Sequence, residues 1–266
     1  MKKLILLSIF LFLIAINDFA QNKTIDSLKL ALKNAKHDTT RCNILNSLTE
    51  ITNDEEWPKY NEQVLKLAEK NINSTPSLKL FYLKHLAAAN NNIGTLCYDQ
   101  GNIKKALEYF IKSLKIQEEI GDKKGIAGTL NNIGMIYHNQ GDLKTALEYY
   151  NKSLKKDREI GYKKGVAASL NNIGDIYKQK DDIKKALEYF TKSLKTWEEI
   201  GDKNGIPRSL NNIGILYSRQ NDIKKALECF IKSLKIQEET GDKYGIANSL
   251  NNISTIYYKQ KNTEMQ

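Results

Sequence analysis

Apolar residues recur along the chain at the spacing of amphipathic helices. Between residues 126 and 137 they are separated by four, three and four positions, which places them on one face of a helix. Gly141 can end this helix in the left-handed conformation, and Asp142 can cap the next one. A second apolar face follows over residues 143–154, and Gly161 again marks a helix end. The pattern therefore predicts two antiparallel helices. Their apolar faces are Ile126, Leu130, Ile133 and Tyr137 in the first and Leu143, Ala146, Leu147, Tyr150 and Leu154 in the second.

The same pattern returns every forty residues. The sequence NNIG begins at residues 91, 131, 171 and 211, and NNIS begins at residue 251. Repetition of a helix pair at a fixed period is typical of solenoids, in which stacked units share a continuous core. We expect a degenerate helical repeat region over residues 21–86 and a repeat array over residues 87–266. The array consists of four units, 87–126, 127–166, 167–206 and 207–246, and a closing helix at 247–262.

Two prolines refine this scheme. In the degenerate region, TTRCNILNSLTEITND and EEWPKYNEQVLKLAEKN predict one helix pair, which ends at NSTPS. Pro76 then precedes a long helix that includes the first NNIG. Pro207 stands where sister units carry Ala127 and Ala167, and proline lacks the backbone N–H that a helix uses. We therefore expect the first helix of unit 207–246 to begin late.

Small and bulky residues keep fixed places within each unit. With Gly134 taken as position 8, positions 8 and 20 are small, whereas positions 4, 7, 11 and 24 are bulky. Two small residues allow two helices to cross closely where no large side chain fits. The small pairs are Gly94 with Ala106, Gly134 with Ala146, Gly174 with Ala186 and Gly214 with Ala226. From residue 87 to about residue 261 the chain closely resembles the tetratricopeptide repeat (TPR). The resemblance implies an all-α fold, a right-handed α-solenoid of antiparallel helix pairs.

The chain departs from that pattern in two ways. Its period is forty residues rather than about 34, which resembles the long-repeat subclass of kinesin light chains and Pins-type G-protein scaffolds. The whole chain is similar to exported bacterial TPR proteins and to the sensor regions of TPR-containing signalling proteins. The last unit carries Ser254 in place of the glycine and has only its first helix. We expect this helix to cover the preceding pair; alternatively, the chain is a piece of a longer one.

The paired asparagines are the main candidates for function, because asparagine is a poor core residue. The resemblance implies that positions 2, 5, 6, 9, 12 and 13 line a concave groove. An amide offers donors and acceptors, which suits the backbone of an extended peptide, and related long-repeat scaffolds hold peptides with such ladders. The predicted ladder at position 6 is Asn92, Asn132, Asn172, Asn212 and Asn252, with Asn131, Asn171 and Asn211 beside it at position 5. Alternatively, the asparagines brace neighbouring helices.

Other groove positions vary between units, as expected if they read the side chains of a ligand. The candidates are Tyr98, His138, Lys178, Arg208, Arg219 and Lys259. The last four make the C-terminal half basic. We therefore expect an acidic segment or a free carboxylate in the ligand.

The N-terminal residues 1–20 have the layout of a secretory signal peptide. Lys2 and Lys3 precede an apolar stretch from Leu4 to about Ile16, and Ala20 offers a cleavage position. The apolar stretch is shorter than the roughly 17–25 residues of a spanning helix, which disfavours a retained membrane anchor. No second hydrophobic span follows, so we expect an exported protein, periplasmic or secreted.

The sequence offers little catalytic chemistry. The three histidines and three cysteines lack the spacing of metal ligands, and no phosphate loop or nucleophile elbow occurs. We therefore expect no enzyme activity, no cofactor and no metal. The net charge is +10, but lysines and glutamates alternate at helical spacing on the second helices, which disfavours nucleic acid as a partner.

Two functions remain open at this point. The first is a non-enzymatic scaffold or adaptor that binds a peptide or protein in the groove. The second is the sensor portion of a truncated or split membrane signalling protein, either a histidine kinase or a transcription regulator. The sequence leaves the partner and the oligomeric state undetermined.

Overall fold

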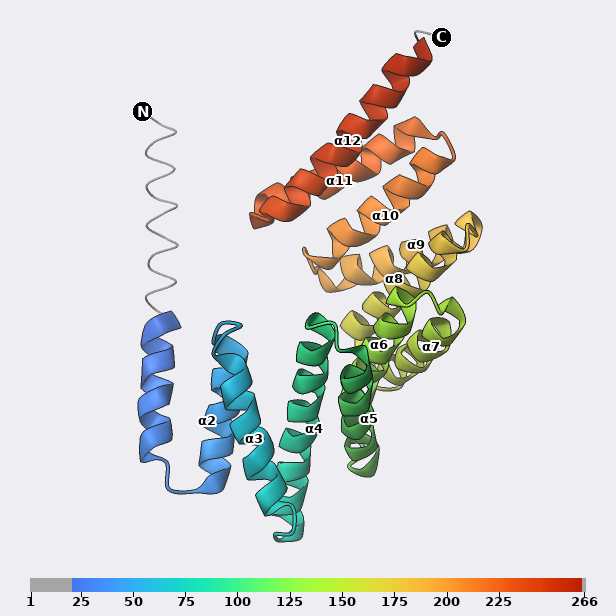
Figure 1. Cartoon of the computed structure of the whole chain (residues 1–266). Coiled ribbons are helices and arrows are strands. Elements are labelled where there is room, and N and C mark those ends of the chain that lie inside the picture. Colours follow the sequence, from blue (N-terminus) through green and yellow to red (C-terminus); the bar gives the residue numbers. More distant parts are fainter. Residues whose placement is uncertain (1–20, 265–266) are drawn as a thin grey trace, which may run out of the picture. The chain divides into compact units, whose positions relative to one another are not determined.

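The computed structural model describes residues 21–264, and every regular element in that range is a helix (Figure 1). The predicted signal peptide at 1–20 lies outside the described residues. A helical segment at 21–34 comes first. The helices that follow are α2 (Asp38–Ile51), α3 (Trp57–Asn71), α4 (Pro76–Asp99), α5 (Ile103–Glu119), α6 (Lys123–Asn139), α7 (Leu143–Glu159), α8 (Lys163–Gln179), α9 (Ile183–Ile200), α10 (Gly205–Arg219), α11 (Ile223–Thr240) and α12 (Lys243–Glu264).

The chain divides into two compact units, residues 1–122 and 123–266. In the described part of the first unit, α2 packs on α3, α3 on α4 and α4 on α5. In the second unit, α6 to α12 do the same. The predicted boundary between 86 and 87 lies inside α4, because the degenerate region and the first NNIG share this long helix.

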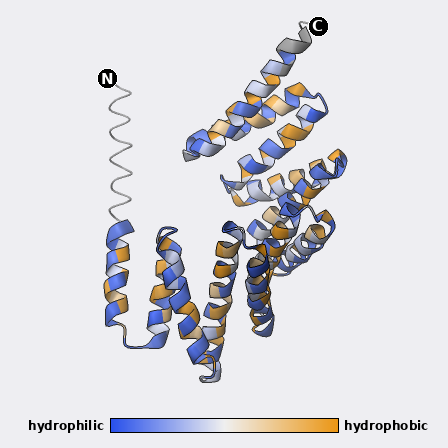
Figure 2. Cartoon of the chain, in the orientation of Figure 1, coloured by the Kyte–Doolittle hydropathy of each residue, from blue (hydrophilic) through white to orange (hydrophobic). Residues whose placement is uncertain are grey.

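Each helix presents one apolar side, visible as bands of hydrophobic residues along the ribbons (Figure 2). In the second unit, Ala146, Tyr150 and Leu154 of α7 form a buried cluster with Leu170, Ile173 and Ile176 of α8. The apolar face predicted for residues 143–154 is therefore confirmed. Because each cluster joins neighbouring helices, the core runs from pair to pair.

The glycine at position 8 allows the two helices of a pair to approach closely. A Cβ atom built on Gly174 would lie 2.7 Å from the ring of Phe190, and one on Gly134 would lie 2.8 Å from the ring of Tyr150. Both rings are fully buried. Ser254 occupies the same position in α12 but is exposed. The prediction that no larger side chain fits the crossing is confirmed.

Helix ends form where the turn residues predicted them. Gly141 and Gly161 have φ angles of 81° and 67°, the left-handed conformation that glycine adopts without strain. Asp142 then caps α7 by accepting a hydrogen bond from the Thr145 backbone N–H at 3.0 Å. At the position of Gly141, the later repeats place Asp181 and Asn221, which adopt the same conformation with φ angles of 56° and 60°.

The first helix of unit 207–246 begins late, as predicted from Pro207. Helix α10 starts at Gly205, whereas α6 and α8 start two repeat positions earlier, at Lys123 and Lys163. Pro207 is the third residue of α10, where a backbone N–H has no acceptor within the helix. The proline therefore shortens the helix without breaking it.

A buried serine at position 27 fastens each second helix to the first helix of its pair. Its hydroxyl donates to the carbonyl at position 1, at 2.8–3.3 Å. The pairs are Ser113 with Ala87, Ser153 with Ala127, Ser193 with Ala167 and Ser233 with Pro207. Each bond satisfies a hydroxyl that would otherwise be costly to bury.

Candidate functional site

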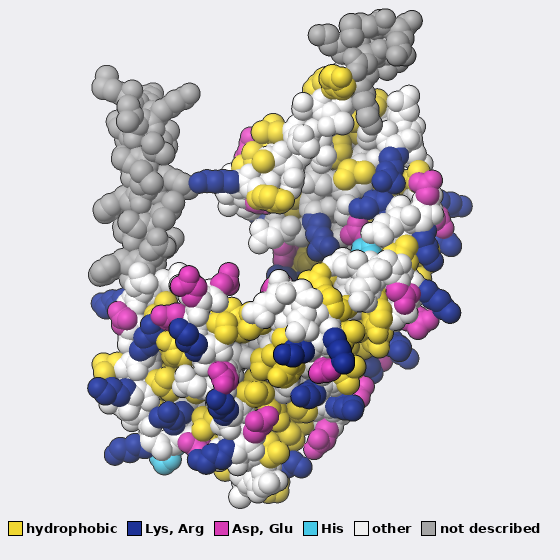
Figure 3. Space-filling model, viewed as in Figure 1, with side chains coloured by type: hydrophobic (Ala, Val, Ile, Leu, Met, Phe, Trp, Pro, Cys, Tyr) yellow, Lys and Arg dark blue, Asp and Glu magenta, His cyan; other side chains and the backbone are white. Residues whose placement is uncertain are grey.

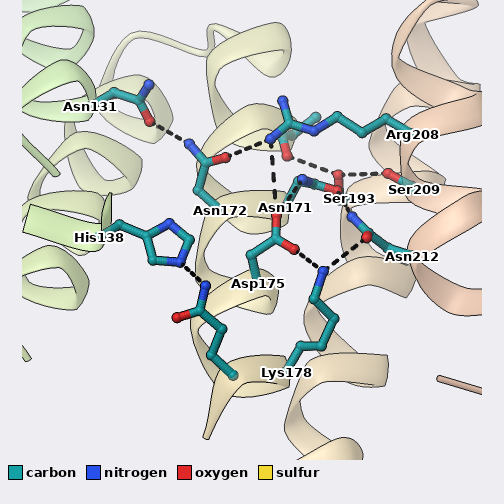
Figure 4. Close-up of polar contacts among 12 residues, drawn as sticks. Asn131, His138, Asn171, Asn172, Asp175, Lys178, Ser193, Arg208, Ser209 and Asn212 are labelled. Carbon is teal, nitrogen blue, oxygen red and sulfur yellow. Dashed lines mark hydrogen bonds and ion pairs between the residues drawn. The ribbon is translucent and has the colours of Figure 1, made fainter. Parts of the chain in front are cut away.

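The asparagine pairs of α6, α8 and α10 are connected by hydrogen bonds between first helices (Figure 4). The Asn172 Nδ2 donates to Asn131 Oδ1 at 2.8 Å. The Asn212 Nδ2 lies 3.4 Å from Asn171 Oδ1, which is the same contact one repeat later. A position-6 amide therefore reaches the position-5 amide of the preceding repeat.

Three charged residues complete this network. Lys178 Nζ lies 2.5 Å from Asp175 Oδ1 and 3.2 Å from Asn212 Oδ1. Arg208 donates to Asn172 Oδ1 at 3.0 Å and lies 4.0 Å from Asp175. Two cations thus share one carboxylate, and the cluster retains a charge of about +1.

Asn171 can take two amide orientations within this network. In one, its Nδ2 lies 3.4 Å from Asp175 Oδ2 and its Oδ1 faces Asn212. In the other, its Oδ1 accepts two hydrogen bonds from Arg208, at 3.0 and 3.2 Å. The second orientation is the stronger, because both bonds are shorter and charge-assisted. Asn171 is fully buried, so its role in either orientation is within the protein.

The other predicted residues are distributed over both units. Asn211 accepts from the Ser249 hydroxyl at 3.2 Å, and His138 Nε2 lies 2.8 Å from Gln179 Nε2. Arg219 is exposed and lies 3.8 Å from Asp181. In the first unit, Asn92 donates to Asn61 at 3.0 Å. Tyr98, Asn131, Asn132 and Asn252 are also half-buried. The side chain of Lys259 lies outside the described residues.

These contacts give the asparagines a bracing role, one of the two alternatives raised by the sequence. An amide has two N–H groups and a carbonyl with two lone pairs. Asn172 uses one N–H and one lone pair in its contacts with Asn131 and Arg208. One donor and one acceptor of this half-buried side chain remain for another partner. Bracing and ligand contact are therefore compatible at this residue.

Beside Asn131 the second unit contains a cavity of about 340 Å³. Three of its lining residues, Gly128, Asn131 and Ala168, occupy positions predicted to face the groove. The rest of the wall is formed by Lys124, Ala127, Ser153, Asp157, Tyr162, Lys164, Gly165, Ser169 and Trp197. The cavity thus lies among α6, α7, α8 and α9, next to the asparagine network.

Asp157 is the unusual member of this wall. Its side chain is only 4% exposed, and none of residues 21–264 forms a hydrogen bond or an ion pair with its carboxylate. Burial raises the pKa of this carboxyl from 3.8 to about 6. Gly165 provides the space, because a Cβ atom there would overlap the carboxylate.

Trp197 is buried beside the same cavity, and its Nε1–H has no hydrogen-bond partner among the described residues. The two lysines of the wall have partners elsewhere. Lys124 Nζ lies 4.8 Å from the centre of the Tyr162 ring, and Lys164 Nζ lies 3.2 Å from Asp202. The cavity therefore combines apolar and aromatic surface with an unpaired carboxylate.

This cavity was not predicted from the sequence, although Asp157 is a signal for it. Asp157 follows Tyr150 by seven residues, so it lies on the buried face of α7. Sister repeats carry Gln117, Trp197 and Gln237 at this position, and each is buried. Asp157 is therefore the one acidic residue at a position that is buried and uncharged in the sister repeats, and this contrast is what points to the cavity.

Other chemistry is sparse in the part of the chain that the structure describes. No group of three or more histidine, cysteine or acidic side chains could hold a metal ion there. The cysteines among these residues are free thiols, and burial raises the pKa of Cys42 to about 12. None of the described helices has the length and hydropathy needed to cross a bilayer. On the face shown in Figure 3, basic and acidic side chains are interspersed.

Comparison with protein families identifies the repeat. The tetratricopeptide repeat family matches residues 85–159, 165–239 and 205–265, which together make up more than half of the chain. No curated protein sequence matches the chain.

Several solved structures share the fold. BtubC from P. vanneervenii is 19% identical with a TM-score of 0.68, over 84% of this chain and 92% of that one. A STAND signal transduction ATPase with a tetratricopeptide repeat sensor, from Pyrococcus horikoshii, is 21% identical with a TM-score of 0.70, over 93% of this chain and 38% of that one. Aspartyl phosphate phosphatase F from Bacillus subtilis is 15% identical with a TM-score of 0.62, over 92% and 71%. At these identities the similarity concerns the fold.

Proposed function

Because this chain belongs to the tetratricopeptide repeat family, we propose that it is a non-enzymatic adaptor that binds a segment of a partner protein. The segment lies against the asparagine-bearing first helices of residues 123–264. One observation carries the proposal: amides of consecutive first helices lie within hydrogen-bond distance at a fixed register, as Asn172 does with Asn131. This arrangement forms a repeating row of donors and acceptors, which matches the repeating polar groups of an extended backbone.

The bracing contacts support this function by fixing the amides in place. A side chain that is already ordered loses little conformational entropy when a ligand binds. Asn172 is held from both sides, by Asn131 of the preceding repeat and by Arg208 of the following one, and Asn212 accepts from Lys178. The amides therefore offer their remaining donor and acceptor groups in a defined geometry.

An acidic stretch of the partner would lie against α10. The cluster of Asp175, Lys178 and Arg208 has an excess of one positive charge, and Arg219 is exposed nearby in sequence. Reversal of Arg208 and Arg219 to glutamate should weaken capture of such a partner, and the loss should be greater at low salt. Unchanged capture at low salt would remove the acidic segment from the proposal.

The experiment is a paired pull-down from an envelope extract with the chain from Gln21. The test bait carries alanine at Asn92, Asn132, Asn172, Asn212 and Asn252. The matched control carries Asn151→Ala, which removes an exposed asparagine of the second helix α7. Circular dichroism and thermal melting establish that all baits are folded.

We expect the wild type and the Asn151→Ala control to retain a partner that the five-alanine bait loses. Equal capture by all three folded baits would show that binding does not use the asparagines. If only the five-alanine bait unfolds, single substitutions at Asn172 and Asn212 replace it. Folded single variants with full capture would then contradict the proposal.

A second candidate is the sensor portion of a signalling protein. The structural similarity to a STAND protein with a tetratricopeptide repeat sensor favours it, and this chain matches only 38% of that protein. The reading frame downstream of residue 266 tests it. A spanning helix followed by a kinase or DNA-binding module would support the sensor.

Export through the segment 1–20 is part of the proposal, because the segment has the charge and apolar pattern of a signal peptide. Fractionation of cells that express the tagged full chain tests it. A mature N-terminus near Gln21 in the periplasm or medium is expected. Retention of the uncleaved chain in the cytoplasm would contradict export.

A further inference from the structure

The cavity among α6, α7, α8 and α9 has a feature that folding alone does not require. A buried carboxylate is costly unless it is paired with a cation or hydrogen-bonded. Asp157 is only 4% exposed, and none of the described side chains pairs with its carboxylate. The carboxylate lines an open cavity of about 340 Å³, so an incoming group can reach it.

We infer that this cavity is an anchor pocket for a cationic side chain, arginine or lysine, of the bound protein segment. The carboxylate of Asp157 supplies the countercharge, and Trp197, which also lines the cavity, supplies an aromatic wall on which a guanidinium or an ammonium can lie. The inference rests on the proposed function, since the segment along the asparagines carries the cation.

The position of the pocket fits this role. Asn131 lines the cavity and also accepts the hydrogen bond from Asn172, so the pocket is continuous with the asparagine network. Gly128 and Ala168 stand at position 2 of their repeats, which is predicted to face the groove. Because both residues are small, they leave the cavity open on the side of the groove. A side chain of an extended segment can therefore enter while its backbone stays beside the amides.

The two lysines of the wall do not neutralise Asp157 in this structure. Lys164 is paired with Asp202, and Lys124 lies over the ring of Tyr162. Both are exposed, so they belong to the rim of the cavity rather than to its interior. The unpaired charge inside is negative, which selects a cation over an anion.

The sister repeats show what the position looks like without this role. Gln237 is buried at the same register, and its Oε1 accepts the Ser249 hydroxyl at 2.7 Å. The corresponding Ser169 lies 3.1 Å from Ser153 and forms no bond with Asp157. The repeat with the acid therefore lacks the internal partner that the glutamine repeat has.

The test uses small probes, because they report on the pocket without any partner protein. N-acetyl-arginine-methylamide is titrated into the chain from Gln21, and its uncharged isostere N-acetyl-citrulline-methylamide is the control ligand. Trp197 fluorescence is the signal in a Trp57→Phe background, which leaves one tryptophan of the two. N-acetyl-glutamate-methylamide tests the opposite charge preference.

We expect the arginine probe to bind about tenfold or more tightly than citrulline, the effect of one charge-assisted pair. Asp157→Gln, which installs the sister residue, should abolish this preference and keep the fold. A second variant, Asp157→Asn, gives the same test if the glutamine variant is unstable. Equal affinity for arginine and citrulline, an unchanged preference in a folded variant, or tighter binding of glutamate would overturn the inference.

The result is separable from that of the pull-down. If the chain prefers arginine through Asp157 but captures no partner through the asparagines, the pocket is retained and the adaptor is rejected. No preference for arginine, together with an asparagine-dependent partner, would retain the adaptor and reject the pocket.

Discussion

Replacement of Asp157 by glutamine should change how the stability of residues 123–264 depends on pH. In the folded chain, burial raises the pKa of the Asp157 carboxyl to about 6, whereas its ordinary value is 3.8. The folded state therefore binds this proton more tightly than the unfolded state. The stabilising contribution of the protonated carboxyl is fully present below about pH 4 and is lost as the pH rises through 6.

The pKa difference gives the magnitude. With 1.36 kcal/mol per pKa unit, the wild type should lose about 2–3 kcal/mol of unfolding free energy between pH 4 and pH 7 relative to the variant. Glutamine is tolerated at this register, since Gln117 and Gln237 are buried there. The variant should therefore be the more stable protein at pH 7.

Urea unfolding at pH 4, 5, 6 and 7 measures this difference, with Trp197 fluorescence in the Trp57→Phe background as the probe. Asp181→Asn is the matched control, because the side chain of Asp181 is 82% exposed. The stability of the control should follow that of the wild type across the range. Parallel curves for wild type and Asp157→Gln would refute the reasoning. A wild type that gains stability with pH would show that Lys124 or Lys164 neutralises the carboxylate in solution.

Three further predictions concern packing and reactivity. Gly174→Ala should destabilise the fold by about 1–2 kcal/mol, because the clash with a buried ring exceeds the better helix propensity of alanine; Ser254→Ala, at the exposed equivalent, should change the melting temperature little. Ser193→Ala should cost about 1 kcal/mol in chemical denaturation through loss of a buried hydrogen bond, and no loss would show that the bond is not stabilising. Cys42 should react with a thiol reagent only as fast as the chain unfolds, because its thiol is buried and its pKa is about 12; rapid labelling of folded protein would contradict this.

The repeat made much of the fold predictable. Helix ends were readable from Gly141 and Gly161, whose left-handed conformation is a local property of the backbone. The late start of α10 followed from Pro207 for the same reason. Close packing at position 8 was readable because small residues recurred at positions 8 and 20, as with Gly174 and Ala186. That the ring of Phe190 is what lies against Gly174 came from the structure.

The candidate site was only partly predictable. The asparagines were found from their register, but periodicity cannot state which groups they contact. The rotation of each first helix against the preceding one decides these contacts. It brings Asn172 to Asn131, and it brings Lys178 and Arg208 to the same carboxylate, that of Asp175. Lys178 and Arg208 are therefore engaged within the protein, and they are less available to a ligand than the sequence suggested.

The sequence by itself determined the helices, their pairing and the family, because these depend on local conformation and on a pattern repeated at a fixed period. The tertiary structure alone decided that Asp157 is buried beside a cavity without a partner. That outcome depends on the space left by Gly165 on the next helix and on the lysines of the wall, which pair with Tyr162 and Asp202 instead. Such contacts join side chains of different helices, and their distances arise only when the helices pack.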